Sequence, residues 1–239
     1  MAKIRLFIDH PLALGQGIAL NTDQAHYLSS VMRQGPGDEI LLFNGQDGEW
    51  LARIERLAKR NGEVVPQRQS APQMDPPDLW LMFAPIKKAR TDFIVEKAAE
   101  LGAARILPVQ TDFTNSERIR QDRLQAHAVE AAEQCGGTFV PEVTDLVPLP
   151  RVLDGWDVTR RILWADEALV GAAETLAGLE KGPWAILIGP EGGFSESERK
   201  RLCAMHCVTR ISLGPRILRA DTAAVAALAL WQSELGDWR

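Results

Sequence analysis

Pro183–Phe194 (PWAILIGPEGGF) and Cys207–Thr222 (CVTRISLGPRILRADT) repeat one pattern, in which an apolar strand is followed by a Gly-Pro turn and a helix start. Trp184–Ile188 is a continuous apolar run of the length of a buried strand. The glycines and prolines that follow it interrupt both strand and helix. Ser195, with Glu198 three residues later, matches a capping box and predicts that a helix begins there.

The two Gly-Pro turns have two interpretations. They could simply end strands, or they could bind a ligand, because open α/β sheets bind ligands beyond the carboxyl ends of their strands. An acidic residue near each turn, Glu191 and Asp221, favours a site if the two strands are neighbours. Neither turn matches G-x-G-x-x-G or ends in Gly-Lys-Ser/Thr, which argues against a dinucleotide site and a P-loop.

The chain from Leu79 onward alternates strands and helices, which predicts an α/β fold with a largely parallel sheet covered on both faces. A helix is expected after Lys87, Lys88 and Arg90 and through about Leu101. Further helices are expected over Ser116–Cys135 and near 168–180, 195–205 and 222–235. The expected strands are Leu79–Ala84, Arg105–Val109, Arg161–Trp164, Trp184–Ile188 and Val208–Leu213.

Residues 1 to about 70 have short strand patterns with close turns, which suggests a small β-barrel. A short helix is expected over Asp23–Met32, and the proline-rich segment Ser70–Asp78 reads as a linker. Arg53, Arg56, Lys59 and Arg60 form either a solvated face or a basic rim. The expected strands are Ile4–Ile8, Glu39–Phe43, Glu49–Ile54 and Glu63–Pro66.

The composition limits the function. The 239 residues are 46% hydrophobic, enough for a sizeable core, and the net charge of −5 provides no overall basic surface for nucleic acid. Cys135, Cys203 and Cys207 lack a C-x-x-C pattern, which argues against a metal site and for reduced thiols in the cytoplasm. No signal-peptide or membrane-spanning pattern is found, so no membrane partner is expected.

The last predicted helix, about Thr222–Leu235, is apolar on nearly all sides. Such a helix is buried. The surface that covers it could belong to the same chain or to a second copy in a dimer, and the pattern alone leaves both open.

Several stretches together resemble the RsmE family, the S-adenosylmethionine-dependent methyltransferases of the SPOUT class that act on small-subunit ribosomal RNA. The similarity covers nearly the whole chain. The matching stretches are Leu187–Glu198 (LIGPEGGFSESE), Ile211–Ala224 (ISLGPRILRADTAA), Asp92–Val109 (DFIVEKAAELGAARILPV), Ala128–Gly136 (AVEAAEQCG) and Val140–Val143 (VPEV).

The resemblance implies a fold, a reaction and partners. It implies a PUA-like, RNA-binding β-barrel over residues 1–72 and a SPOUT-type parallel-sheet domain with a carboxyl-terminal trefoil knot over residues 73–239. It also implies a homodimer that methylates N3 of a uridine in 16S ribosomal RNA during ribosome biogenesis. S-adenosylmethionine would be the cofactor, with no metal.

The same resemblance implies roles for particular residues. Arg219 would hold the uracil oxygens or a phosphate, since its planar guanidinium suits paired oxygens. Asp221 and Glu191 are candidate bases, although Asp221 could instead cap the last helix. Candidates for the RNA contact are Lys87, Lys88, Arg90, Arg53 and Arg60. The expected cofactor-binding residues are Ile188, Gly189, Glu191, Gly192, Gly193, Leu213, Gly214, Ile217, Leu218, Thr222 and Ala223.

Three departures from the family pattern affect these roles. Ala220-Asp221 stands where Thr-Glu is common, Asp112-Phe113-Thr114 replaces a common Glu-Arg-Ser, and Gly137 replaces a basic residue. They leave room for a non-catalytic RNA-binding protein built on a SPOUT-like dimer. A third alternative, an oxidoreductase with a nucleotide cofactor, lacks its glycine fingerprint.

Overall fold

The computed structural model describes residues 4–116, 118–169, 176 and 178–238, which form two compact units. The first unit contains the described residues up to Asp75 together with Ala132–Val140. The second contains Pro76–Ala131 and the described residues from Pro141 onward. The expected domains, residues 1–72 and 73–239, stay a prediction. The contacts place the division after Asp75 and add a later segment to the first unit.

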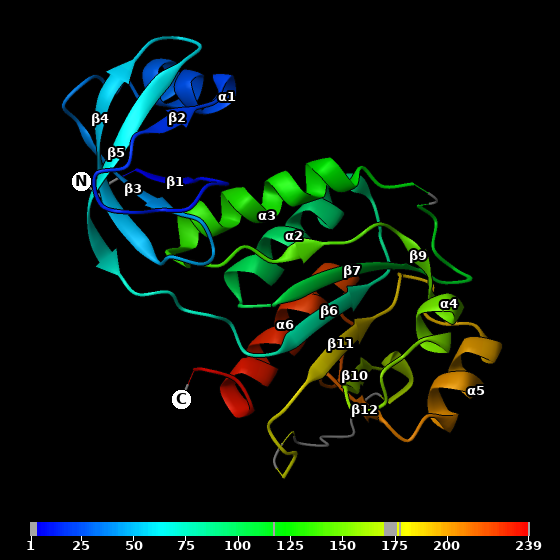
Figure 1. Ribbon diagram of the computed structural model, residues 1–239. Coiled ribbons are helices and arrows are strands. Elements are labelled where there is room, and N and C mark those ends of the chain that lie inside the picture. The colour runs from blue at the N-terminus through cyan, green and yellow to red at the C-terminus, as the bar shows by residue number, and fades with distance from the viewer. Residues whose placement is uncertain (1–3, 117, 170–175, 177, 239) are drawn as a thin grey trace. The chain divides into compact units, whose positions relative to one another are not determined.

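The first unit has a five-stranded sheet with the order β1-β3-β4-β5-β2 (Figure 1). Only the β1–β3 pair is parallel. A helix, α1 (Thr22–His26), continues into one π-helical segment, η1 (Tyr27–Val31). The strands are β1 (Arg5–Phe7), β2 (Ile18–Leu20), β3 (Glu39–Phe43), β4 (Glu49–Leu57) and β5 (Gly62–Ala71).

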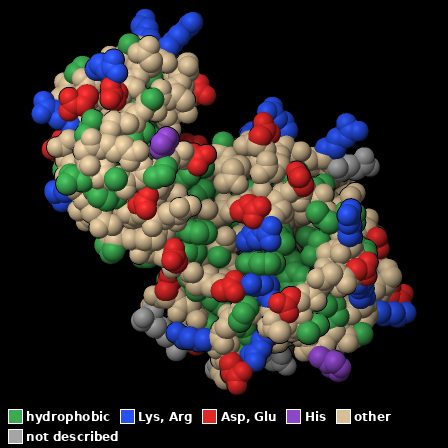
Figure 2. Space-filling model, in the orientation of Figure 1, with side chains coloured by type: hydrophobic (Ala, Val, Ile, Leu, Met, Phe, Trp, Pro, Cys, Tyr) green, Lys and Arg blue, Asp and Glu red, His purple; other side chains and the backbone are tan. Residues whose placement is uncertain are grey.

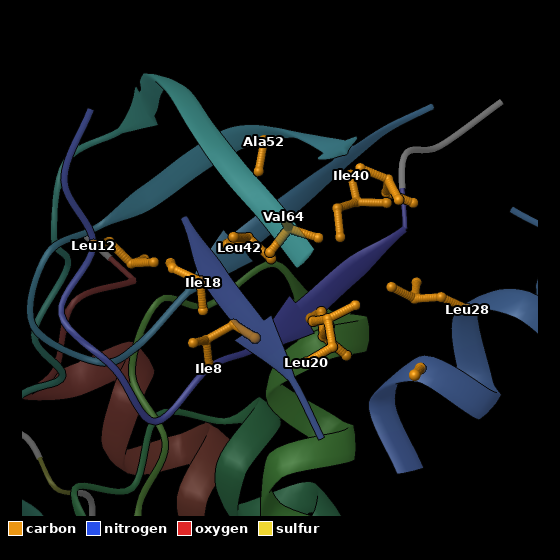
Figure 3. Close-up of a cluster of buried hydrophobic side chains, with 12 residues drawn as sticks. Ile8, Leu12, Ile18, Leu20, Leu28, Ile40, Leu42, Ala52 and Val64 are labelled. Carbon is orange, nitrogen blue, oxygen red and sulfur yellow. The ribbon is translucent and has the colours of Figure 1, made fainter. Parts of the chain in front are cut away.

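Side chains from all five strands meet in one hydrophobic core (Figure 3). Leu20, Ile40 and Val64 are among its buried members, and Leu28 reaches it from η1. The β4–β5 pairing has three register shifts, and such irregularities bend a strand and increase its twist. The sheet can therefore curve around a single core, as expected for a small barrel.

Arg5 joins β1 to the segment 132–140 of the same unit. Its guanidinium donates to the backbone carbonyls of Ala132 (2.7 Å) and Gly137 (2.8 Å) and pairs with Glu49 (2.7 Å). A cation at the last carbonyls of a helix is favourable, and Ala132 lies in the last turn of α3. This explains how a segment distant in sequence belongs to the first unit.

The second unit is built on a parallel sheet with the order β12-β10-β11-β6-β7-β8, and β9 pairs with β7. Its central strands are buried on both faces, which is why they read as continuous apolar runs. The strands are β6 (Leu79–Phe83), β7 (Arg105–Gln110), β8 (Glu142–Val143), β9 (Val147–Pro148), β10 (Arg161–Ala165), β11 (Trp184–Ile188) and β12 (Val208–Ile211).

Helices cover both faces of this sheet (Figure 1). α2 packs against α6, which contacts β11, while α4 and α5 supply Leu149, Leu153 and Leu202 to a core cluster with β10 and β11. The helices are α2 (Lys88–Glu100), α3 (Gln121–Cys135), α4 (Leu149–Asp154), the 3-10 helix η2 (Glu167–Leu169), α5 (Glu196–Ala204) and α6 (Ala220–Glu234).

Most predicted elements are present, several of them with different ends. α3 begins at Gln121 rather than Ser116, and β4 and β5 extend beyond their expected ends. The linker begins only after Ala71, where β5 ends. Of the helix expected near 168–180, the structure has η2, and residues 170–175 and 177 lie outside the described residues. The short elements β2, β8, β9 and α4 were not predicted.

Candidate active site

The loops that follow β10, β11 and β12 enclose a cavity of about 240 Å³ at the carboxyl edge of the sheet. The two strands that precede the Gly-Pro turns, β11 and β12, are not direct neighbours, because both pair with β10, which lies between them. A third loop, carrying Asp166 and Glu167, therefore lines the cavity between the two Gly-Pro loops. Most of its lining residues are glycines or apolar residues of these three loops and of the first turn of α6.

Glycines shape the loop after β11. Gly193 has a φ of 70°, and a Cβ there would overlap the carboxylate of Glu167. A Cβ at Gly189 would lie 2.6 Å from the ring of Phe194, which is buried against Trp164. Gly189 requires glycine because the backbone passes too close to a buried ring, and Gly193 requires it because of its φ.

The loop after β12 contributes an apolar wall. Gly214 has a φ of 108°, in the region that favours glycine. Ile217 lines the cavity although 80% of its surface is exposed, and Leu218 beside it is half-buried. The loop ends at Arg219, the N-cap residue of α6, whose side chain makes no capping hydrogen bond.

A buried carboxylate anchors the loop after β10. Asp166 is 3% exposed and accepts hydrogen bonds from Arg199 (2.8 Å), Arg210 (2.8 Å) and the backbone N–H of Ala168 (3.0 Å). Burial alone would raise its pKa, but the Ala168 N–H and the two guanidinium groups outweigh burial and hold the pKa of Asp166 below its usual value. Asp166 is thus an ionised structural anchor at the cavity wall.

Three charged residues meet at the cavity rim. Arg90, near the start of α2, donates to Glu191 Oε1 (3.0 Å) and lies 3.6 Å from Asp221 Oδ2. The Arg90 side chain is 30% exposed, so it can hold both carboxylates while one side remains open to solvent. One guanidinium thus joins the loop after β11 to the first turn of α6.

No group of three or more His, Cys, Asp or Glu residues suitable for a metal ion occurs among the described residues. A search of the same residues finds no helix long and apolar enough to cross a membrane.

Comparison with known proteins assigns the chain to a protein family. Residues 73–232 match the family model of the RNA methyltransferase domain, and residues 20–67 match that of the RNA methyltransferase PUA domain. Ribosomal RNA small subunit methyltransferase E of Rickettsia conorii is 31% identical over 94% of this chain and 93% of its own length. The chain belongs to the RsmE family.

Two solved structures of methyltransferases agree with this assignment. A putative methyltransferase of Legionella pneumophila with bound SAM is 28% identical, covers 99% of this chain and 100% of its own, and has a TM-score of 0.88. A ribosomal RNA small subunit methyltransferase E of Neisseria gonorrhoeae bound to S-adenosylmethionine is 26% identical, covers both chains fully and also has a TM-score of 0.88. The predicted fold class, a SPOUT-type parallel-sheet domain with a PUA-like domain before it, is confirmed. The knot stays a prediction.

Most residues that the resemblance assigned to an RsmE cofactor site lie together. Gly192 and Thr222 do not line the cavity; Gly192 packs beside Phe113 instead. The remaining nine all line it: Ile188, Gly189, Glu191, Gly193, Leu213, Gly214, Ile217, Leu218 and Ala223.

The three catalytic candidates are placed differently from one another. Arg219 and Glu191 line the cavity, whereas Asp221 does not and contacts Arg90 and Thr222 instead. Asp221 is not the N-cap of the last helix, as the alternative had it, because α6 begins at Ala220 with Arg219 as its N-cap.

The five predicted RNA-contact residues fall into three groups. Lys87 and Lys88 are exposed at the start of α2, and neither has an ion-pair partner within the described part of the chain. Arg90 is ion-paired at the rim. Arg53 and Arg60 are exposed in the first unit, in β4 and in the turn before β5, and Arg53 lies 3.9 Å from Glu55.

Sequence reasoning missed Asp166 and Glu167. Both follow β10, and an acidic residue directly after a buried strand was the available signal.

Proposed function

We propose that this chain transfers the methyl group of S-adenosylmethionine to N3 of a uridine in small-subunit ribosomal RNA. The observation that carries the proposal is the cavity, whose glycine-rich and apolar lining suits a nucleoside cofactor. Its lining also carries the carboxylate of Glu191 and two guanidinium groups that have no partner among the described residues. Relatives named for this activity, and similar structures that bind S-adenosylmethionine, support it.

The reaction requires a base and precise positioning. N3 of uracil loses its proton, the N3–CH₃ bond forms and the S–CH₃ bond breaks, and the bonding electron pair remains on sulfur as S-adenosylhomocysteine forms. Glu191 is the better base candidate, since it lines the cavity and Asp221 does not. Arg90 fixes the position of the Glu191 carboxylate, and such positioning contributes strongly to catalysis.

Arg219 and Arg216 are suited to the negative charge of the substrate. Both line the cavity, both are exposed, and no hydrogen-bond or ion-pair partner is found for either among the residues that the structure describes. A guanidinium can contact two oxygens at once, either of a uracil anion or of a phosphate. The sulfonium of the cofactor is positive and gives these side chains nothing to bind.

Methyl transfer to isolated small ribosomal subunits tests the proposal. Subunits from a strain that lacks this modification are incubated with labelled S-adenosylmethionine, and the product nucleoside is identified by chromatography. The expected product is 3-methyluridine. RNA binding without any methyl transfer would instead indicate the non-catalytic alternative.

We further propose that the enzyme is a homodimer of the cytoplasm. Leu230 on α6 and Phe93 on α2 are 47% and 39% exposed, and these two helices pack against each other. The apolar outer face of α6 therefore remains available to a second copy of the chain. Sedimentation velocity measures whether two copies associate. Three free cysteines agree with a reducing compartment.

Substituting Gly193 by alanine is expected to weaken S-adenosylmethionine binding at least tenfold. The new Cβ would have an unfavourable φ and would displace the carboxylate of Glu167 at the cavity wall. Gly15, with a φ of 73° and open space around it, provides the matched control. Gly15→Ala should cost similar stability, about 1 kcal/mol, without changing calorimetric cofactor affinity. Equal cofactor affinity in both variants would show that S-adenosylmethionine does not bind in this cavity.

Removing two charges at the start of α2 is expected to flatten the salt dependence of RNA binding. On the face shown in Figure 2, basic and acidic side chains are interspersed, so local groups must meet the phosphates. Lys87→Gln with Lys88→Gln should lower the slope of log affinity against log salt by about 1.4–1.8, or 0.7–0.9 per contact. The control, Lys181→Gln with Lys200→Gln, changes the same charge elsewhere. An identical slope in both double variants would show that Lys87 and Lys88 do not contact RNA phosphates.

A further inference from the structure

An exposed aromatic side chain stands beside the active-site loop without any role in the cavity. In the strand order β10-β11-β6-β7, the cavity lies toward β10, and the loops after β6 and β7 lie on the other side of the loop after β11. The loop after β6 carries Lys87 and leads to Lys88 and Arg90, and the loop after β7 carries Phe113. Cationic and aromatic groups therefore follow the carboxyl edge of the sheet directly beyond the cofactor cavity.

Phe113 is close to the residues that line the cavity. A Cβ built on Gly192 would lie 3.3 Å from the Cβ of Phe113. The neighbours of Gly192 in the chain, Glu191 and Gly193, both line the cavity. The Phe113 ring is thus adjacent to the loop that carries the proposed base, yet the side chain remains 48% exposed.

Hydrogen bonds hold the loop around Phe113 in place. Asp112 accepts from the Ser195 hydroxyl (2.5 Å), and its backbone N–H donates to Glu198 (2.9 Å). On the other side, Thr111 and Thr114 bond to each other through backbone and side chain. Because the loop is held on both sides of Phe113, its backbone loses little conformational freedom when the exposed ring binds a flat ligand.

A base whose N3 is to be methylated must be unpaired, because N3 lies on its Watson–Crick edge. When such a base is also splayed out of the stack, both of its faces are exposed, and proteins hold such bases by stacking them on aromatic side chains. We propose that Phe113 is the platform on which the target uracil stacks, with its N3 edge directed toward Glu191 and the cofactor cavity. This inference rests on the proposed function and adds the residue that orients the base.

Three variants test the stacking. Phe113→Ala should lower kcat/KM for methyl transfer to unmodified small subunits by about 5- to 150-fold, the range for loss of one base–aromatic contact. Phe113→Leu should be similarly slow although it keeps an apolar side chain, and Phe113→Trp should retain activity. Calorimetric affinity for S-adenosylmethionine should stay within twofold in all three. The control Val158→Ala, at a residue 72% exposed and ahead of β10, should match the wild type.

A binding cycle separates stacking from a merely structural role. An RNA fragment containing the methylated position is compared with the same fragment carrying an abasic nucleotide there. The abasic change should weaken binding to the wild type but not to Phe113→Ala, since the contact is then already lost. Full activity of Phe113→Ala, an equal abasic penalty in both proteins, or an altered oligomeric state of the variant would each overturn the inference. If the wild type transfers no methyl group at all, the proposed function itself fails.

Discussion

Replacing Arg219 by alanine is expected to slow methyl transfer about 10²–10³-fold while leaving S-adenosylmethionine affinity almost unchanged. This is the size of effect found when one preorganised donor to a developing anion is removed. Arg219 lines the cavity, is exposed, and has no partner among the described residues that would explain its presence. Its guanidinium would meet the uracil anion or a phosphate only when RNA is bound, so the loss belongs to the transfer step.

The stability of the variant separates catalysis from folding. A cation at a helix N-terminus is unfavourable, and Arg219 is the N-cap of α6. Arg219→Ala should therefore not destabilise the protein, and Arg219→Lys should rescue transfer poorly because an ammonium cannot make a two-pronged contact. Single-turnover transfer is measured beside calorimetric cofactor binding, with Arg151→Ala on α4 as an exposed-arginine control. Equal losses of binding and transfer would contradict the assignment.

Replacing Asp166 by alanine is expected to lower the free energy of unfolding by about 3 kcal/mol, the lower end of the range for breaking a buried ion pair. The carboxylate is buried, and its removal leaves Arg210 without an ion-pair partner and Arg199 with only Glu167. The lower end applies because the Arg199 and Arg210 side chains are 25% and 36% exposed, and because Arg199 keeps Glu167 at 3.3 Å. Urea unfolding at neutral pH measures the difference.

The pH dependence identifies the ionised carboxylate as the cause. The pKa of Asp166 is lowered in the folded protein, so its stabilisation is present above the unfolded pKa of about 3.9 and is lost as the pH falls through the folded pKa. The difference in the free energy of unfolding between wild type and Asp166→Ala should therefore become smaller below about pH 4. Asp157→Asn, at an exposed aspartate whose pKa is also lowered, should change the free energy of unfolding far less, because solvent screens the charge of an exposed carboxylate. A gap that is constant with pH would assign the effect to packing alone.

Local signals in the sequence were sufficient for several elements. β11 has the predicted ends, and α5 begins directly after Ser195, whose capping box with Glu198 is present. These features succeed because a buried strand and a helix cap are determined by residues within a few positions of each other. Both Gly-Pro loops line the cavity, as expected. Their glycines were a usable local signal because φ values such as those of Gly193 and Gly214 require glycine wherever the loop lies.

The tertiary structure alone decided which loops meet. Strand order depends on pairing between distant segments, and β10 lies between β11 and β12, which brings Asp166 into the site. The same packing gives Arg90, expected on the RNA surface, two carboxylates to hold, and sets Phe113 beside Gly192. None of these contacts joins residues close in sequence, so no local pattern encodes them. Spacing and periodicity report the preferences of a segment, whereas charge pairing and the exposure of a side chain depend on what the rest of the chain packs against it.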